Sequence, residues 1–233
     1  MHNRITLGRM QNPVRGFLHG TAAIMSLIGT VLLVIRASSL AGQVAMIVYG
    51  IGLLALYTTS SIYHSIPWQE TNKKRMQRID HAMIFVLIAS TYTPIGMIVL
   101  DGWLRLVSLG VAWSIALIGV SHHLFVRNQR FHLSIGLMVT LGWLGLPLMV
   151  PMANRAGLAL VGLIAAGGVV YTVGMVIVAT NRPRLWPRVF SSHELFHVFV
   201  VTASGLHFAA ILRYVAPLTG SPAMAAPLGP LPL

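Results

Sequence analysis

The chain has no cysteine, and only four of its 233 residues are acidic. Without cysteine it can form no disulfide, and it can hold a metal ion only through nitrogen and oxygen ligands. Charged residues make up 9% of the sequence, whereas a water-soluble domain carries about a quarter. Because 56% of the residues are hydrophobic and the mean hydropathy is +0.78, the composition predicts a chain embedded in lipid.

The excess of basic over acidic residues has two possible meanings. Sixteen bases against four acids give a net charge of +12, a balance that is also typical of nucleic-acid-binding proteins. Here, however, the bases occur in short clusters between long apolar runs, so they form no continuous basic face for phosphates. We interpret them as topology signals and as contacts to anionic lipid head groups, and we predict no nucleic-acid partner.

Long apolar runs divide the chain into seven candidate membrane-spanning helices. A helix needs about 20 mainly apolar residues to cross the hydrocarbon core of a bilayer. The candidate spans are roughly 16–35, 40–65, 79–100, 103–124, 132–150, 157–179 and 191–214. The sequence therefore predicts an all-α membrane protein, a seven-transmembrane helix bundle.

The basic residues fall mostly on one side of the membrane in this layout. The N-terminus and every second joint contain twelve of the sixteen bases, and the other side contains four. Loops rich in Lys and Arg stay in the cytoplasm. We therefore predict a cytoplasmic N-terminal segment (1–15), a seven-helix membrane domain (16–215) and a disordered, Pro-rich tail outside the cytoplasm (216–233). Fourteen arginines against two lysines suggest a bacterial protein, located in the plasma (inner) membrane.

Several polar residues lie at span ends that this topology places at one membrane depth. Span two ends with Ser60 and His64, which share a helix face because they are four residues apart. Asp80 opens span three, and His193 and His197, again four apart, open span seven. Ionisable groups within spans are costly and by default mark function. Since span two ends on the side where spans three and seven begin, we expect these side chains to meet.

Three neutral imidazoles and a water are the usual ligands of a catalytic zinc ion. We therefore predict His64, His193 and His197 as zinc ligands. Zinc lowers the pKa of its bound water to about 7. Asp80 could hold that water and accept its proton, and Ser60 could orient the water or donate to a developing oxyanion.

Other histidines fall in the same layer or close to it, and their roles stay open. His19, at the start of span one, is expected to support the metal ligands or to pack between helices. His122 and His123 end span four, either as alternate ligands or as a polar helix end. His207 lies ten residues beyond His197, nearer the middle of the bilayer, and is expected to be a packing or hydrogen-bonding group.

With these residues identified, the chain resembles the haemolysin III family, within the wider progestin and adipoQ receptor superfamily that includes the adiponectin receptors. The resemblance rests on the order and spacing of Ser60-x-x-x-His64, Asp80, Tyr92-Thr93-Pro94 and His193-x-x-x-His197, and it covers about residues 13–214. It implies a seven-helix fold with a cytoplasmic N-terminus. It also implies zinc on the three histidines, with the residues that match Asp80 and Ser60 beside the zinc-bound water.

The first span departs from the family pattern. The family usually has acidic residues and an Asn ahead of the His, whereas Arg15 stands where that Asn would be, before His19. We therefore carry over no role for the first-span motif beyond His19, and the effect of Arg15 stays open.

Three functions fit these residues, and whether the protein is an enzyme stays open. The first is a zinc-dependent hydrolase of lipid amides or esters in membrane lipid homeostasis, with membrane lipids as substrates. The second is an intramembrane metalloprotease, because His193-Glu194-x-x-His197 matches a zinc-protease motif, although no acid follows His197 as a further ligand. The third is a non-enzymatic sensor or receptor of membrane state with a structural zinc. The substrate, the oligomeric state and the role of Glu194 are left undetermined.

Overall fold

The computed structural model describes residues 10–126, 131–186 and 189–220, and over these residues the protein is helical with no β-strand. The main helices are α1 (Pro13–Arg36), α2 (Leu40–Ser65), α3 (Glu70–Pro94), α4 (Gly102–Phe125), α5 (Phe131–Trp143), α6 (Met149–Ala156), α7 (Leu158–Thr180) and α8 (Ser192–Ala210). Four short irregular helices join or extend them: η1 (Ile95–Val99), η2 (Leu146–Leu148), η3 (Ile211–Val215) and η4 (Ala216–Gly220).

Seven helical segments in the described part of the chain are long and apolar enough to cross a membrane. They are Pro13–Arg36, Leu40–Ser65, Glu70–Val99, Gly102–Phe125, Ser134–Ala156, Leu158–Thr180 and Ser192–Gly220. The predicted all-α fold with seven spans is therefore confirmed.

Three span boundaries differ clearly from the predicted ones, and one of them is the end of the fifth span, at Ala156 instead of 150. α3 already begins at Glu70, because its polar first turns continue the helix beyond the apolar run that starts at residue 79. The seventh span continues through η3 and η4 to Gly220, so residues 216–220 of the predicted tail are helical. Residues 221–233 lie outside the described residues, as do 1–9, and the predicted division into domains stays a prediction.

The fifth span is interrupted near its middle. α5 ends at Trp143 and α6 begins at Met149, with η2 between them. Pro147 has no backbone N–H to donate to the carbonyl four residues earlier. The chain tightens there instead, and the Leu148 N–H donates to the Gly145 carbonyl at 3.0 Å.

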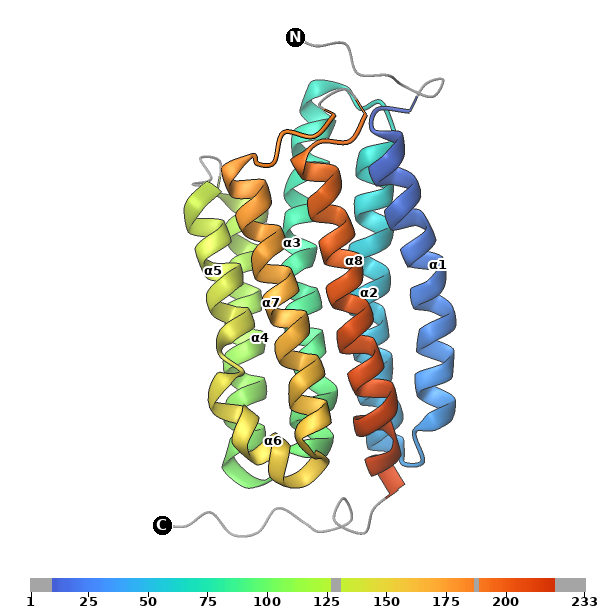
Figure 1. The fold of residues 1–233 in the computed structure, drawn as a ribbon, viewed down its shortest axis with the longest axis vertical. Coiled ribbons are helices and arrows are strands. Elements are labelled where there is room, and N and C mark those ends of the chain that lie inside the picture. The colour runs from blue at the N-terminus through green and yellow to red at the C-terminus, as the bar shows by residue number, and fades with distance from the viewer. Residues whose placement is uncertain (1–9, 127–130, 187–188, 221–233) are drawn as a thin grey trace.

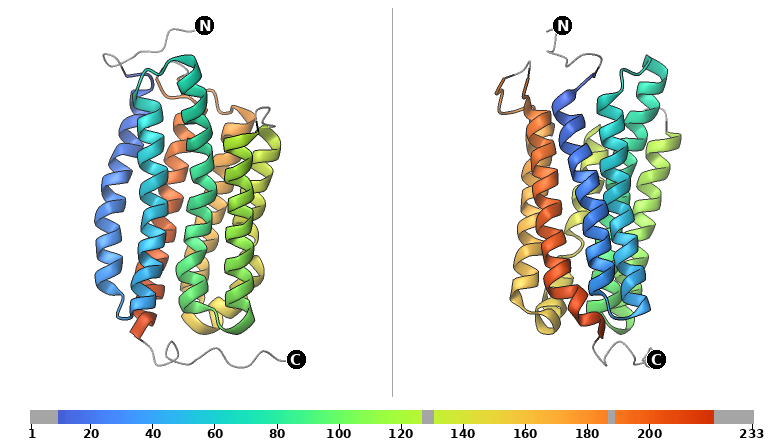
Figure 2. Two further views of the ribbon diagram at one scale, coloured as in Figure 1. Left: turned by 180° about the vertical axis from the view of Figure 1, so that it is seen from behind. Right: turned by 90° about the vertical axis from the view of Figure 1, so that its right-hand side faces the viewer.

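The helices form an upright bundle in which consecutive spans run antiparallel (Figure 1). α2 ends, and α3 and α8 begin, at the same end of the bundle, which we call the histidine end. α1 begins at the histidine end, whereas η4 lies at the opposite, far end (Figure 2). α1 packs mainly along α2 and also contacts α8, so α8, the last of the long helices described, lies close to the first.

The outer surface of the bundle is apolar. Ile35 on α1 and Leu158 on α7 are 76% and 79% exposed, and many other large apolar side chains are exposed along the spans. An apolar surface of this extent suits contact with lipid. Small residues allow close approach inside the bundle, for example at Gly119 of α4, which packs against Phe85 of α3.

Candidate metal centre

The last turns of α2 bring Ser60 and His64 into the bundle at the histidine end. The two residues are four apart on one helix face, and each is 2% exposed. α2 stops immediately afterwards at Ser65. The helix therefore delivers a hydroxyl and an imidazole to the interior just before the chain turns toward α3.

The first turn of α8 is fixed by a capping box. The Ser191 hydroxyl accepts a hydrogen bond from the His193 backbone N–H at 3.3 Å, and the Glu194 carboxylate accepts from the Ser191 backbone N–H at 2.7 Å. This reciprocal pattern defines where a helix starts. It fixes the turn that contains His193, with His197 one turn further along the same face.

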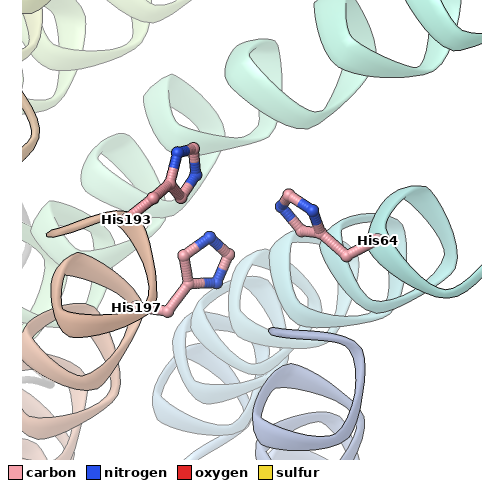
Figure 3. Close-up of side chains that lie close together, drawn as sticks. All are labelled: His64, His193 and His197. Carbon is pink, nitrogen blue, oxygen red and sulfur yellow. The ribbon is translucent and has the colours of Figure 1, made fainter. Parts of the chain in front are cut away.

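His64, His193 and His197 converge on one point (Figure 3). One ring nitrogen from each lies within 4.8 Å of the others. The ring centroids are 4.8 Å apart for His64 and His197 and 5.0 Å apart for His193 and His197. The three side chains come from α2 and α8, and the structure thus brings together the histidines that the predicted topology places at one depth.

The nitrogen atoms of this group suit a metal ion. Both ring nitrogens of His64 and Nδ1 of His197 are buried and have no hydrogen-bond partner within the described structure. A buried polar atom left in this way costs about 1–3 kcal/mol, and a cation bound between the rings would remove that cost for the one nitrogen that each ring directs at it. Imidazole donors suit zinc, copper, iron or nickel. The group of three can therefore hold a metal ion.

Asp80 and Ser60 also meet at the histidine end. The side chains of Ser60 and Asp80 lie close enough to interact, and both residues are buried, with Asp80 only 8% exposed. Ser60 lies one turn before His64 on α2. The structure thus joins the predicted acid and the predicted hydroxyl, and their role beside the metal ion stays a prediction.

Sequence reasoning missed one contact of this region, between Arg15 and Glu194. The Arg15 Nε donates to a Glu194 carboxylate oxygen at 2.7 Å, and the two side chains are only 7% and 6% exposed. Two opposite charges within apolar spans are each costly alone, and this cost was a signal that they should pair.

His19 lies against the three-histidine group without belonging to it. Its ring centroid is 4.1 Å from that of His197 and 5.0 Å from that of Tyr57. His19 is 3% exposed, and its two ring nitrogens have no hydrogen-bond partner among the described residues. This position agrees with the predicted packing or support of a metal ligand.

The other described histidines do not belong to the three-histidine group. His123 hydrogen-bonds with the Ser134 hydroxyl, and its ring centroid is 5.6 Å from that of His81 and 5.7 Å from that of His122. His207 bonds to the Ile164 carbonyl at 3.1 Å, as expected of a deeper hydrogen-bonding group. His2 and the side chain of His132 lie outside the described residues.

An apolar cavity of about 140 Å³ lies inside the bundle, beyond the histidine group. Its lining comes mainly from α3, α5, α7 and α8 and includes Leu87, Tyr92, Met138, Trp143, Phe196 and Val200. Phe196 is also within 5.7 Å and 6.0 Å, centroid to centroid, of His197 and His193. One aromatic ring therefore separates the cavity from the three-histidine group.

Comparison with known proteins relates this chain to one family. The family model described as "Haemolysin-III related" matches residues 8–208. The chain is 32% identical to "Hemolysin-3" of Bacillus cereus over 202 residues, which cover 85% of this chain and 89% of the relative. It is 31% identical to the "Hemolysin-3 homolog" of Bacillus subtilis, with 84% and 90% covered. It is also 25% identical to the human "Monocyte to macrophage differentiation factor", with 85% and 82% covered.

Proposed function

Since this chain belongs to the haemolysin-III related family, as its sequence motifs predicted, we propose that it binds zinc and hydrolyses amide or ester bonds of membrane lipids. The observation that carries the proposal is the convergence of His64, His193 and His197 on one point inside a membrane-spanning bundle. Three neutral nitrogen ligands leave room for water and substrate, as in catalytic zinc sites.

Different residues of the protein would bind the metal ion, accept a proton and orient the water during hydrolysis. When bound, zinc supplies Lewis acidity, which polarises a carbonyl and makes water acidic enough to attack it near neutral pH. The imidazoles of His64, His193 and His197 would hold the ion. The Asp80 carboxylate accepts the proton of the attacking water, and Ser60, whose side chain lies beside that carboxylate, orients the water.

The apolar cavity supports a lipid substrate. Its walls are predominantly hydrophobic, and only the Phe196 ring lies between it and the histidine group. A pocket of this kind binds apolar ligands and orients them with few polar groups. An acyl chain lying along the cavity would bring its carbonyl toward the metal ligands. The proposed location is the bacterial plasma (inner) membrane, which the two Bacillus relatives support.

The ion pair of Glu194 argues against a metalloprotease. In the His-Glu-x-x-His motif of those enzymes, the glutamate is the general base of the metal site. Here one oxygen of Glu194 accepts from Arg15 and the other accepts from the Ser191 N–H. Both oxygens are thus occupied by structural contacts, and we assign the base to Asp80.

The test of the proposed function is hydrolysis by purified protein in lipid nanodiscs. Release of fatty acid from ceramide and from ester lipids would be compared between wild type and Asp80→Asn. We expect Asp80→Asn to retain its zinc and to lose about 100- to 10,000-fold in rate, as general-base removal does. Asp101→Asn is the matched control, because Asp101 lies at the far end and pairs with Arg105 at 3.2 Å.

Two outcomes would contradict a hydrolase. If zinc is bound but wild type releases no fatty acid from either lipid class, the non-enzymatic sensor or receptor becomes the better description. If Asp80→Asn hydrolyses lipid as fast as wild type, Asp80 is not the base. Cleavage of a membrane peptide that depends on Glu194 would instead indicate the protease.

A further inference from the structure

At the histidine end, α1 and α8 meet through two pairs of side chains, one turn apart on each helix. Arg15 and His19 are four residues apart on α1, and Glu194 and His197 are three apart on α8. The first pair is the buried ion pair at 2.7 Å. The second is the contact of the His19 and His197 rings, with centroids 4.1 Å apart. The two pairs therefore fix which face of α1 packs against which face of α8.

α1 is also tied to the helix that carries the third ligand. The Asn12 backbone N–H donates to the His64 carbonyl at 2.8 Å, and the Ser61 hydroxyl donates to the Gly16 carbonyl at 2.8 Å. α1 thus contacts both helices that supply the metal ligands, although no residue of α1 belongs to the three-histidine group.

Glu194 lies in sequence between the two ligands of α8. Its carboxylate is held from one side by Ser191 and from the other by Arg15. A rotation of α8 about its axis that broke the ion pair would turn His193 and His197 away from His64 on α2. In a low-dielectric interior such a rotation is costly, because it leaves two buried charges unpaired.

The ion pair also balances charge next to the cation site. The Arg15 guanidinium lies close enough to His64 and His197 to interact with both electrostatically. A positive charge at this position would repel a bound cation, and Glu194 offsets it. Removing Glu194 leaves that repulsion in full, whereas removing Arg15 leaves a carboxylate that Ser191 still holds.

We propose that Arg15 and Glu194 form a positioning pair for the metal centre: their ion pair fixes the rotation of α8 and neutralises the charge beside the bound ion. The inference rests on the proposed zinc binding. It adds to that proposal a role for two residues that bind no metal and take no part in hydrolysis.

The test is a double-mutant cycle read out as zinc affinity, measured with a competing chelator on full-length protein in nanodiscs. We expect Glu194→Gln to weaken zinc binding about 10- to 100-fold, the range for residues that support metal ligands. Arg15→Met should weaken it less. The double variant should bind more tightly than Glu194→Gln, because it has no uncompensated guanidinium. The control Asp101→Asn, which neutralises an acid at the far end, should match wild type.

The outcomes separate this inference from the function on which it rests. Wild type that binds no zinc would refute the metal site itself. Zinc affinity equal to wild type in Glu194→Gln and Arg15→Met would overturn the positioning pair, even if the metal-free variants unfold at lower temperature. If Glu194→Gln fails to fold, a comparison of Arg15→Lys with Arg15→Met tests the proposal instead. We expect Arg15→Lys, which keeps the positive charge, to preserve zinc affinity. Equal losses of zinc affinity in the two variants would overturn the proposal.

Discussion

His64 and His197 are each 2% exposed, yet ring nitrogens of both lack a hydrogen-bond partner in the described structure. A soluble protein could satisfy such nitrogens with water, but the interior of a bundle in lipid offers little. The two rings are therefore poorly satisfied unless a ligand lies between them. This is the residue-scale reason to regard the group as a metal site rather than as packing.

We expect purified wild type to contain about one zinc ion per chain, the occupancy of a single site with three protein ligands. His64→Ala, His193→Ala and His197→Ala should each lose it, because two imidazoles seldom retain zinc against a chelator. Elemental analysis of dialysed protein provides the measurement.

His207→Ala is the matched control for these variants. His207 is a histidine of the same helix as His193 and His197, and its ring bonds to the Ile164 carbonyl. It should therefore retain the zinc. Unchanged metal content in all three ligand variants would refute the ligand assignment.

Arg15 departs from the family pattern but forms a specific contact in this structure. The family usually has an Asn at this position, and a guanidinium within an apolar span needs a partner. Glu194 supplies it from α8. Because the two residues are far apart in sequence, only the packing of the first span against the last shows the pair.

At the scale of helices, close approach depends on particular glycines. A Cβ at Gly119 of α4 would lie 2.4 Å from the ring of Phe85 on α3, whereas one at Gly110 of the same helix would meet nothing within 4 Å. The two glycines therefore have different uses in one helix. Gly119 lets α3 and α4 pack, and Gly110 faces outward.

We expect Gly119→Ala to lower the free energy of unfolding by about 1–3 kcal/mol, because overpacking moves a fully buried aromatic ring. Gly110→Ala should leave stability unchanged or raise it by up to about 1 kcal/mol, since alanine favours helix over glycine. Unfolding by SDS in mixed micelles measures both. Equal stability of the two variants would show that α3 and α4 do not approach each other at Gly119.

The α8 helix illustrates how local sequence positions a site. The Ser191 and Glu194 pattern fixes where the helix begins, and the spacing of His193 and His197 places both on one face. Those two features are readable from residues alone. Contact with α2 is not, because His64 is separated from α8 by more than a hundred residues.

At the scale of the whole molecule, the described helices fix which segments share an end of the bundle. The side that faces the cytoplasm follows instead from the distribution of basic residues. Lys73, Lys74, Arg75 and Arg78 lie in the first turns of α3, at the histidine end. The positive-inside rule therefore predicts that the three-histidine group lies at the cytoplasmic end of the bundle.

The absence of cysteine makes this orientation easy to test with single-cysteine variants. Lys74→Cys at the histidine end should resist a membrane-impermeant maleimide in intact cells and react after permeabilisation. Asn154→Cys, an exposed position of α6 near the far end, should react in intact cells. The reverse pattern would invert the predicted topology, and labelling of both sites from outside would contradict the seven-span arrangement.

The sequence by itself determined the number of spans, the shared depth of the metal ligands and the family. Bilayer thickness sets the length of an apolar run, and the alternation of spans assigns each span end to one side. Depth follows from these two facts alone. For that reason the residue order is enough to assign Ser60, His64, Asp80, His193 and His197 to one layer.

Only the tertiary structure decided which residues of that layer face each other. Depth says nothing about the rotation of a helix about its axis, and rotation depends on packing between helices distant in sequence. His19, His122 and His123 share the depth of the ligands, yet none belongs to the group whose nitrogens converge. The Arg15–Glu194 ion pair became visible for the same reason, because it depends on how α1 and α8 turn toward each other.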